Sequence, residues 1–201
     1  MRFIAACLAA LALSACHSAS VSESQCIAGD WQTVGYRDGA AGYRSSRLLE
    51  HQNACVKHGV IPDRDAYMAG WNEGVREYCE PNNGYDVGVR GAPYYNVCPA
   101  DLRDAFLDAY HQGRSLYVAR AEVADLQQEI AARETRLTEI KTQIVGAATQ
   151  QLDPTLTPAA RVDLLAATQR LAEEKGRIES ELPQLRQQLA YKSQQLASLE
   201  G

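Results

Sequence analysis

A short motif of one acidic, one small and one aromatic residue recurs along the first half of the chain. The pattern D-x4-[GA]-[YW]-x2-G occurs three times, ending at Gly39, Gly74 and Gly113. A partial fourth copy without the acid begins at Gly84. Small residues four apart lie on one face of a helix and let another backbone come close. Because glycine costs about 1 kcal/mol relative to alanine inside a helix, we expect aromatic rings packed against the bare backbone to compensate.

The repeat sets the first half of the chain apart from the second. Twelve of the fourteen aromatic residues and eleven of the fourteen glycines lie within residues 26–117. We predict helices near 30–43, 45–58 and 63–79, and an ordered loop over 80–98, where prolines and glycines crowd together. The alternative for some glycines is that they end helices. The residues assigned to the structural motif are Asp30, Trp31, Gly35, Tyr36, Gly39, Gly70, Trp71, Gly74 and Tyr85.

The N-terminus has the layout of a secretory signal peptide. Residues 1–15 combine a basic start at Arg2 with an apolar run that is too short to span a membrane. Leu13-Ser14-Ala15-Cys16 resembles the lipobox of bacterial lipoproteins, in which the peptide is cut before the cysteine and the cysteine is acylated. The alternative is an ordinary signal peptide that is cut elsewhere, with Cys16 as an unmodified thiol.

Acylation of Cys16 would anchor the mature chain firmly, because several acyl chains on one residue bind a membrane where a single chain binds only marginally. Residue two of the mature chain would be His17. Resemblance to lipoproteins sorted in Gram-negative bacteria then implies the inner leaflet of the outer membrane, facing the periplasm, since the aspartate that retains lipoproteins at the inner membrane is absent. Residues 16–25 are rich in serine and are predicted to form a flexible tether.

The charge of the chain argues against nucleic acid as a partner. The net charge is −5, and removal of residues 1–15 takes away one base, Arg2, and no acid, so the mature chain has a net charge of −6. Nucleic-acid binding demands clustered basic residues, and anionic lipid headgroups are bound by polybasic segments. The chain has only four lysines, so the acyl chains are expected to provide the membrane affinity.

Four cysteines remain for disulfide bonds once the signal peptide is removed and Cys16 is acylated. An even number in an exported chain indicates disulfides, and four cysteines allow three pairings. We favour Cys79–Cys98 with Cys26–Cys55, because residues 79–98 form a segment that a bridge can close. Such a bridge contributes roughly 3 kcal/mol.

A metal site is the competing interpretation of one cysteine. His51, Cys55 and His58 are spaced i, i+4 and i+7, so one helical face would present all three, and zinc accepts such ligands. The missing fourth ligand and the oxidising compartment argue against it. We therefore predict no metal and no cofactor.

Several of these motifs together carry a family resemblance. They are D-W-x2-G-Y-x-D-G from Asp30 to Gly39, a following Cys55, G-W-x2-G-x3-Y-C from Gly70 to Cys79, G-Y-x2-G from Gly84 to Gly88 and V-C-P from Val97 to Pro99. In this combination the chain resembles domain-of-unknown-function family 2799, a family of small bacterial envelope proteins of which many look like lipoproteins. The resemblance covers residues 26–117. It implies an exported location and a shared fold, and it implies no activity.

The second half of the chain is predicted to form two long helices. Apolar residues keep a spacing of three to four on both sides of Pro154 and Pro158, with Arg133 as one interruption. The two prolines must break the helix, so we expect a turn near 150–158 and an antiparallel coiled-coil hairpin over 118–201. Self-association through the same apolar residues is the alternative.

The sequence thus predicts an all-α protein, in which a small disulfide-stapled helical domain over 26–117 precedes the hairpin. Pro183 lies inside the second helix of the hairpin and should kink or briefly break it. Thr168, Lys175 and Lys192 fall on the apolar stripe of that helix, where they either specify register or partner or lie exposed.

No catalytic motif stands out. A nucleophile elbow G-x-S-x-G is absent from the sequence, and no phosphate-binding glycine loop follows a strand pattern. Asp63 with Asp65, or Asp101 with Asp104, would suit a glycan-cleaving acid–base pair, but an aspartate near a helix start is typically a cap. We predict a structural or interaction lipoprotein rather than an enzyme.

The hairpin is the expected partner-binding part. An envelope protein, peptidoglycan and a second copy of the chain are the partner classes that stay open. The alternative function is a periplasmic glycan- or small-ligand-binding module. Its cleft would be lined by Trp31, Tyr36, Trp71 and Tyr85.

Overall fold

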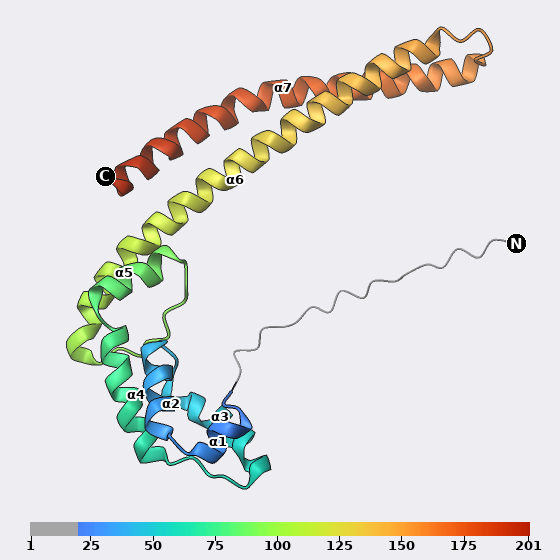
Figure 1. Cartoon of the computed structure of the whole chain (residues 1–201). Coiled ribbons are helices and arrows are strands. Elements are labelled where there is room, and N and C mark those ends of the chain that lie inside the picture. Colours follow the sequence, from blue (N-terminus) through green and yellow to red (C-terminus); the bar gives the residue numbers. More distant parts are fainter. Residues whose placement is uncertain (1–19) are drawn as a thin grey trace, which may run out of the picture. The chain divides into compact units, whose positions relative to one another are not determined.

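A computed structural model describes residues 20–201, and its regular elements are all helical (Figure 1). The prediction of an all-α protein is confirmed. In chain order the elements are α1 (Glu23–Ala28), α2 (Trp31–Ala40), the 3₁₀ helix η1 (Ser45–Arg47), α3 (Leu48–Cys55), the 3₁₀ helix η2 (Val56–His58), α4 (Arg64–Tyr78), α5 (Pro81–Val89), α6 (Ala100–Gln151) and α7 (Pro158–Glu200).

The helices belong to two compact units. The first unit comprises the chain up to Glu80 together with Tyr94–Arg103, and the second comprises Pro81–Pro93 together with Asp104–Gly201. The single domain expected over 26–117 is therefore divided between the two units. The reason is that the third and fourth copies of the glycine motif pair with each other, as described below, and not with the first two.

The first unit begins with α1, whose start is fixed by a capping box. The Ser22 hydroxyl accepts the backbone N–H of Gln25, and the Gln25 side-chain oxygen accepts the backbone N–H of Ser22 at 2.8 Å. Residues 23–25 are therefore helical. The prediction of a flexible tether over 16–25 is wrong for these three residues. The signal peptide and Cys16 lie outside the described residues.

Glycines bring α2 and α4 together in the first unit (Figure 1). A Cβ atom added to any of them would lie less than 3.0 Å from backbone atoms of the opposite helix. The backbones themselves are thus in contact, and the prediction that aromatic rings fill this space is wrong at these positions. We call this contact the glycine seam; its residues are Gly35, Gly39, Gly70 and Gly74.

Aromatic rings do pack on glycine, but in the turn after α2. Gly42 has a left-handed backbone (φ +74°), and the ring of Tyr78 lies where its side chain would be. The indole N–H of Trp71 donates to the carbonyl oxygen of Tyr43 at 2.9 Å. The turn and the end of α4 are therefore tied together by two aromatic side chains of α4.

The second unit repeats this arrangement with α5 and the early part of α6. Gly84 and Gly88 face backbone atoms of Phe106 and Tyr110, and Gly113 faces the carbonyl oxygen of Tyr85. Residues 80–98 were predicted to be a loop, and this is wrong for Pro81–Val89. Pro81 suits the first turn of a helix, and the glycines that look like breakers supply the close contact with α6.

The correspondence extends to the turn after α5. Gly91 (φ +70°) lies under the ring of Tyr117, as Gly42 lies under Tyr78. The Tyr110 hydroxyl donates to the carbonyl oxygen of Ala92 at 3.0 Å, in the place where Trp71 donates to Tyr43 in the first unit. The two helix pairs are thus internal copies of one structural motif.

Two disulfides staple the first unit, in the pairing favoured from the sequence. Cys26 is bonded to Cys55 with 5.5 Å between their Cα atoms, and Cys79 is bonded to Cys98 with 5.6 Å. Both half-cystines of the first bond are buried in the core of this unit. That core cluster consists of Cys26, Trp31, Val34, Cys55 and Tyr67.

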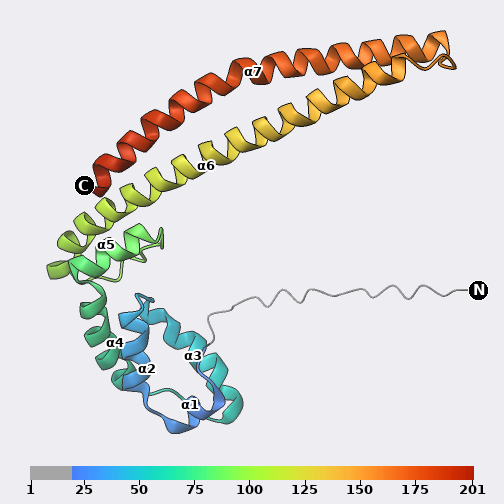
Figure 2. The ribbon, with the colours of Figure 1, turned by 45° about the horizontal axis from the view of Figure 1, so that its top comes forward.

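The rest of the second unit is an antiparallel pair of long helices, α6 and α7 (Figures 1 and 2). Their shared core cluster contains Ile130 and Ile140 of α6 with Ile178 and Leu182 of α7. The turn falls at residues 152–157, within the predicted range. Pro183 does not break α7, which is continuous across it and only curves (Figure 2). Its neighbour Leu182 stays buried against α6 and holds the helix in place.

Candidate functional site

The motif residues predicted from the sequence are mostly structural. Asp30 caps α2, because its Oδ1 accepts the backbone N–H of Thr33 at 3.1 Å, and this bonding lowers the pKa of the Asp30 carboxyl. Trp31 is buried in the core of the first unit. The Tyr36 hydroxyl donates to Glu77, which joins α2 to α4. A cleft that uses Trp31 as a binding surface is therefore not formed.

A buried polar cluster that was not predicted from the sequence joins three helices of the first unit. Asp38 of α2 accepts the Tyr67 hydroxyl of α4 at 2.8 Å and pairs with Arg47 at 3.2 Å. His51 of α3 lies 2.7 Å from the same carboxylate. Its Nδ1 accepts the backbone N–H of Val21, so the ring proton lies on Nε2 and is donated to Asp38.

This cluster is closed to solvent. Asp38 is 8% exposed, His51 2% and Tyr67 0%, so no substrate can reach the group. Burial, followed by the hydrogen bond to Asp38, raises the pKa of the Tyr67 hydroxyl and keeps it protonated as a donor. The arrangement satisfies buried polar atoms and fixes the positions of α2, α3 and α4.

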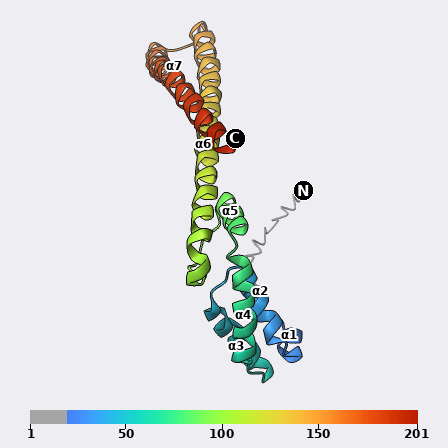
Figure 3. The ribbon, with the colours of Figure 1, turned by 90° about the vertical axis from the view of Figure 1, so that its left-hand side faces the viewer.

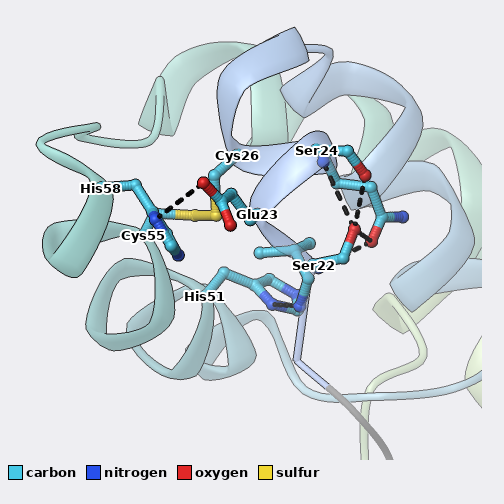
Figure 4. Close-up of a disulfide and its surroundings, with 9 residues drawn as sticks. Ser22, Glu23, Ser24, Cys26, His51, Cys55 and His58 are labelled. Atoms are coloured by element: carbon cyan, nitrogen blue, oxygen red, sulfur yellow. Dashed lines mark hydrogen bonds and ion pairs between the residues drawn. A yellow bond between two sulfur atoms is a disulfide. The ribbon is translucent and has the colours of Figure 1, made fainter.

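The competing metal and acid–base interpretations are not supported by the geometry. Cys55 is bonded to Cys26, and His51 is turned toward Asp38, so the spacing i, i+4 and i+7 does not gather a ligand set. His58 pairs with Glu23 instead, with 3.5 Å between its Nδ1 and the Glu23 Oε1 (Figure 4). No cluster of three or more metal-ligating side chains occurs within residues 20–201.

The aspartates considered as catalytic groups have other partners. Asp63 caps α4, since its Oδ1 accepts the N–H groups of Asp65 and Ala66, both at 3.0 Å. Asp101 accepts a hydrogen bond from Arg76 at 2.8 Å, which lowers the pKa of the Asp101 carboxyl. A helix cap and an exposed ion pair account for these carboxylates.

A shallow pocket of about 340 Å³ opens in the first unit beside Arg44, Trp71 and Tyr95. The Arg44 Nε donates to the carbonyl oxygen of Tyr95 at 3.3 Å, and the guanidinium lies 5.4 Å from the centre of the Tyr95 ring. Trp71, one of the aromatic residues predicted to line a cleft, thus lines a pocket. The pocket offers a cation and two rings, together with the hydroxyl groups of Ser45 and Ser46.

The hairpin is held in register by ion pairs between its helices. Partners run in opposite directions along α6 and α7, which defines the antiparallel alignment. Arg133 and Lys192, which interrupt the apolar stripes, both take part. Exposed ion pairs contribute at most about 1 kcal/mol each, so their main effect here is alignment. The pairs are Arg120–Glu200, Glu122–Lys192, Arg133–Glu181, Glu134–Arg186 and Arg136–Glu174.

The turn of the hairpin is closed by side chains. Arg161 of α7 donates to the carbonyl oxygens of Gln151 at 2.7 Å and Asp153 at 2.9 Å, so it caps the end of α6. The Thr157 hydroxyl accepts the N–H of Ala160 and caps the start of α7. Because both helix ends are capped, the turn presents a defined surface.

Apolar side chains are exposed around this turn. Leu152 is 81% exposed, Val145 66%, Val162 64% and Leu165 55%. We call these four residues the tip face. They lie beside the apolar seam of the hairpin and are not part of its core cluster.

The geometry of antiparallel helices places Val145 and Leu165 on the same side of the hairpin. Val145 follows the seam residue Ile144, and Leu165 follows the half-buried Leu164, so each is rotated by about 100° from the seam. Equal rotations in two antiparallel helices lead to the same side. Val162 precedes Leu165 by three residues and shares its face.

The described helices include none that is long and apolar enough to cross a membrane. In Figure 3 α6 is a single long helix. Its sequence has charged residues at short intervals from Asp101 to Lys141. This finding is restricted to residues 20–201.

The comparison with protein families agrees with the resemblance noted in the sequence. Residues 30–115 match the model of a family described as "Protein of unknown function (DUF2799)". We refer to residues 30–115, which match this model, as the DUF2799 segment. No curated protein and no solved structure matches the chain.

The DUF2799 segment contains both glycine-paired helix motifs and the buried polar cluster. It also contains three of the four half-cystines, Cys55, Cys79 and Cys98. It ends within α6, before the hairpin core. The tip face therefore lies outside the DUF2799 segment and is a feature of the remaining part of this chain.

Proposed function

We propose that the protein is a lipid-anchored component of the bacterial cell envelope that binds another envelope protein through the tip face. Acyl chains on Cys16 attach it to the inner leaflet of the outer membrane, on the periplasmic side. The exposure of four apolar side chains around the capped turn carries this proposal. The role is structural or connective, and it involves no catalysis.

The tip face differs from ordinary scattered surface residues. Single exposed apolar side chains are common in monomeric proteins, but a cluster marks an interaction site. Val145, Val162 and Leu165 lie on a second face of helices whose first face is already buried in the hairpin core, and Leu152 lies in the turn between them. The packing of α6 against α7 within one chain therefore leaves these side chains uncovered.

The chemistry of the tip face favours a protein partner. An apolar helical face binds well in an apolar groove of another protein, whereas peptidoglycan presents mostly polar groups. The cations on the apolar stripes are already paired within the hairpin and do not compete for a partner. Arg133 and Lys192 pair with the opposite helix, and Lys175 pairs with Glu179 in its own helix. A second copy of the chain is the remaining candidate of matching chemistry.

The Arg44 pocket favours a second function, the binding of a small glycan or acidic ligand. Trp71 and Tyr95 offer rings on which a sugar can stack, and Arg44 offers a cation. This pocket is shallow, and Trp31, which a larger cleft would need, is buried. The tip face is therefore the better-supported site.

Site-specific photo-crosslinking in living cells tests the proposal. A photoreactive amino acid replaces Thr155 in the turn, and matched controls carry it at Gln187 on α7 and at Tyr85 on α5, which are both exposed. We expect a discrete adduct from the Thr155 probe and none from Gln187. Mass spectrometry of that adduct identifies the partner, including a second copy of the chain.

The controls separate the alternatives. Adducts from Tyr85 alone would move the binding surface to the DUF2799 segment. The absence of any adduct, with the protein present at normal abundance, would contradict a protein partner at the tip face, and binding of glycan fragments to the Arg44 pocket would then be measured.

A further inference from the structure

The start of the described chain is fixed to α3. The backbone N–H of Val21 donates to His51 Nδ1 at 3.3 Å, and the Val21 side chain packs against the core cluster of the first unit. A few residues later, Cys26 is bonded to Cys55 at the end of α3 (Figure 4). The chain is therefore held beside α3 from Val21 onward.

Val21 follows Cys16 by only five positions in the sequence. A chain of that length spans at most about 18 Å, whatever its conformation. A helix with its side chains is about 10 Å thick. If Cys16 is acylated, as the proposed function requires, α3 must stay within roughly two helix diameters of the bilayer surface.

The side of α3 that points away from the core exposes two large apolar side chains beside the polar Gln52 and Asn53. Leu49 and Val56 are seven residues apart in the helical run from Ser45 to His58 and lie on one face, opposite the inward-facing His51. They are 62% and 63% exposed. Ile61, in the segment after η2, is 80% exposed. We call Leu49, Val56 and Ile61 the outer face of the first unit.

A groove runs along this outer face between Leu49 and Ile61. Its volume is about 580 Å³, and its lining is mixed. The further apolar residues are Leu48, Pro62 and Met68, and the uncharged polar ones are Ser45, Ser46 and Gln52. Arg64 is the charged side chain in the lining, which contains no acidic residue. An apolar surface with a cation at its border suits the interface of a bilayer that contains anionic headgroups.

The anchor makes even a small apolar surface sufficient for docking. Three side chains would not hold a free protein on a membrane. A tethered protein has already lost its freedom to diffuse away, and its effective concentration at the surface is high. The outer face therefore needs to supply only the small additional free energy that orients the first unit.

We infer that the first unit rests on the bilayer with its outer face, Leu49, Val56 and Ile61, inserted at the lipid headgroup–acyl boundary. The occupant of the groove is the lipid surface itself. The inference rests on the acylation of Cys16 in the proposed function and adds a second membrane contact to it. The unit is thus a docked domain, with no free movement on its tether.

Fluorescence quenching by lipids tests this contact in the full-length acylated protein. An environment-sensitive fluorescent amino acid replaces Val56, or Glu73 on the exposed side of α4 as the matched control. The protein is reconstituted in vesicles of phosphatidylethanolamine and phosphatidylglycerol, with or without bromine on the acyl chains. Flotation of the vesicles reports the anchor independently of the fluorescence.

We expect brominated lipids to quench most of the emission at Val56 and little of the emission at Glu73. The double variant Leu49→Ser/Ile61→Ser, which changes only exposed side chains, should lose that quenching. Protein that floats with the vesicles and shows no quenching at Val56 would overturn the docking while leaving the anchor intact. A blue-shifted, unquenched Val56 probe would also overturn it, because the face would then be covered by protein. Protein that does not float would refute the anchor and the docking together.

Discussion

The carbonyl oxygen of Tyr36 in α2 lies in the space that a side chain at Gly74 in α4 would occupy. Gly113 and Tyr85 stand in the same relation in the second unit. The glycines of the repeat are thus required by contact between backbones, and the copies of the motif act in pairs.

Substitution of Gly74 by alanine should therefore destabilise the first unit. The new methyl group would force the two helices apart, and overpacking of this kind costs about 1–3 kcal/mol. Gly146→Ala in α6 is the matched control, because no atom lies within 4 Å of its added Cβ. That variant should gain up to about 1 kcal/mol from helix propensity. Urea unfolding followed by circular dichroism measures the free energy of unfolding of both variants. Equal effects of the two substitutions would contradict the close backbone contact at the glycine seam.

Much of this fold follows from the sequence, because spacing and breakers are local signals. The long helices, the position of their turn and the helices over residues 30–79 were predicted from them. The helix α5 was not predicted, since Gly84 and Gly88 look like breakers until α6 is seen to pack on them. Which copies of the motif pair with each other depends on the tertiary structure and cannot be read from the motifs alone.

The candidate sites divide along the same line. The cysteine pairing and the cap role of Asp63 could be predicted from position. The cluster of Asp38, His51 and Tyr67 could not, because its members are far apart in the chain and share no spacing. The tip face was missed for a different reason: Val145 and Leu165 lie one step off the apolar stripe, where a seam pattern gives them no weight.

Loss of the Cys79–Cys98 bond should lower the stability of the first unit. The bond joins the end of α4 to the segment after α5 and closes a loop of sequence separation 19. The chain-entropy estimate for a loop of this size is about 3 kcal/mol. We expect the variant Cys79→Ser/Cys98→Ser to show lower steady-state abundance in cells and a lower free energy of unfolding. Unchanged values for both would remove the stapling role.

The hairpin should lose stability in acid. The Arg136 guanidinium donates two hydrogen bonds of 2.8 Å to Glu174 and lowers the pKa of that carboxyl below its ordinary value of 4.5. Because the folded-state pKa is lowered, the contribution is present above pH 4.5 and is lost as the pH falls through the folded pKa. Between neutral and acidic pH, the thermal unfolding temperature should fall less for Glu174→Gln than for the unsubstituted protein.

Glu173→Gln is the control for that measurement, since Glu173 accepts a hydrogen bond from Gln169 within its own helix. Its acid sensitivity should match that of the unsubstituted protein. If Glu174→Gln and Glu173→Gln were equally acid-sensitive, the Arg136 pair would not contribute to the hairpin.

Replacement of Cys16 by serine should release the protein from membranes. The lipobox interpretation makes the Cys16 acyl chains the main source of membrane affinity, and the outer face alone is too small to hold the chain. Fractionation of cells should move the Cys16→Ser variant from the membrane to the soluble fraction, with its abundance maintained by a heterologous signal peptide. Retention of this variant in the membrane fraction would show that the anchor lies elsewhere.

Binding of a partner by the tip face is tested most directly by the yield of the Thr155 crosslink in substituted proteins. The double variant Leu152→Ser/Val162→Ser removes half of the tip face without touching the buried core. Tyr191→Ser, which removes a 60% exposed apolar side chain from another part of α7, is the control. We predict that the double variant loses most of the adduct while Tyr191→Ser keeps it. An undiminished adduct in a correctly folded double variant would contradict the proposal that this face binds the partner.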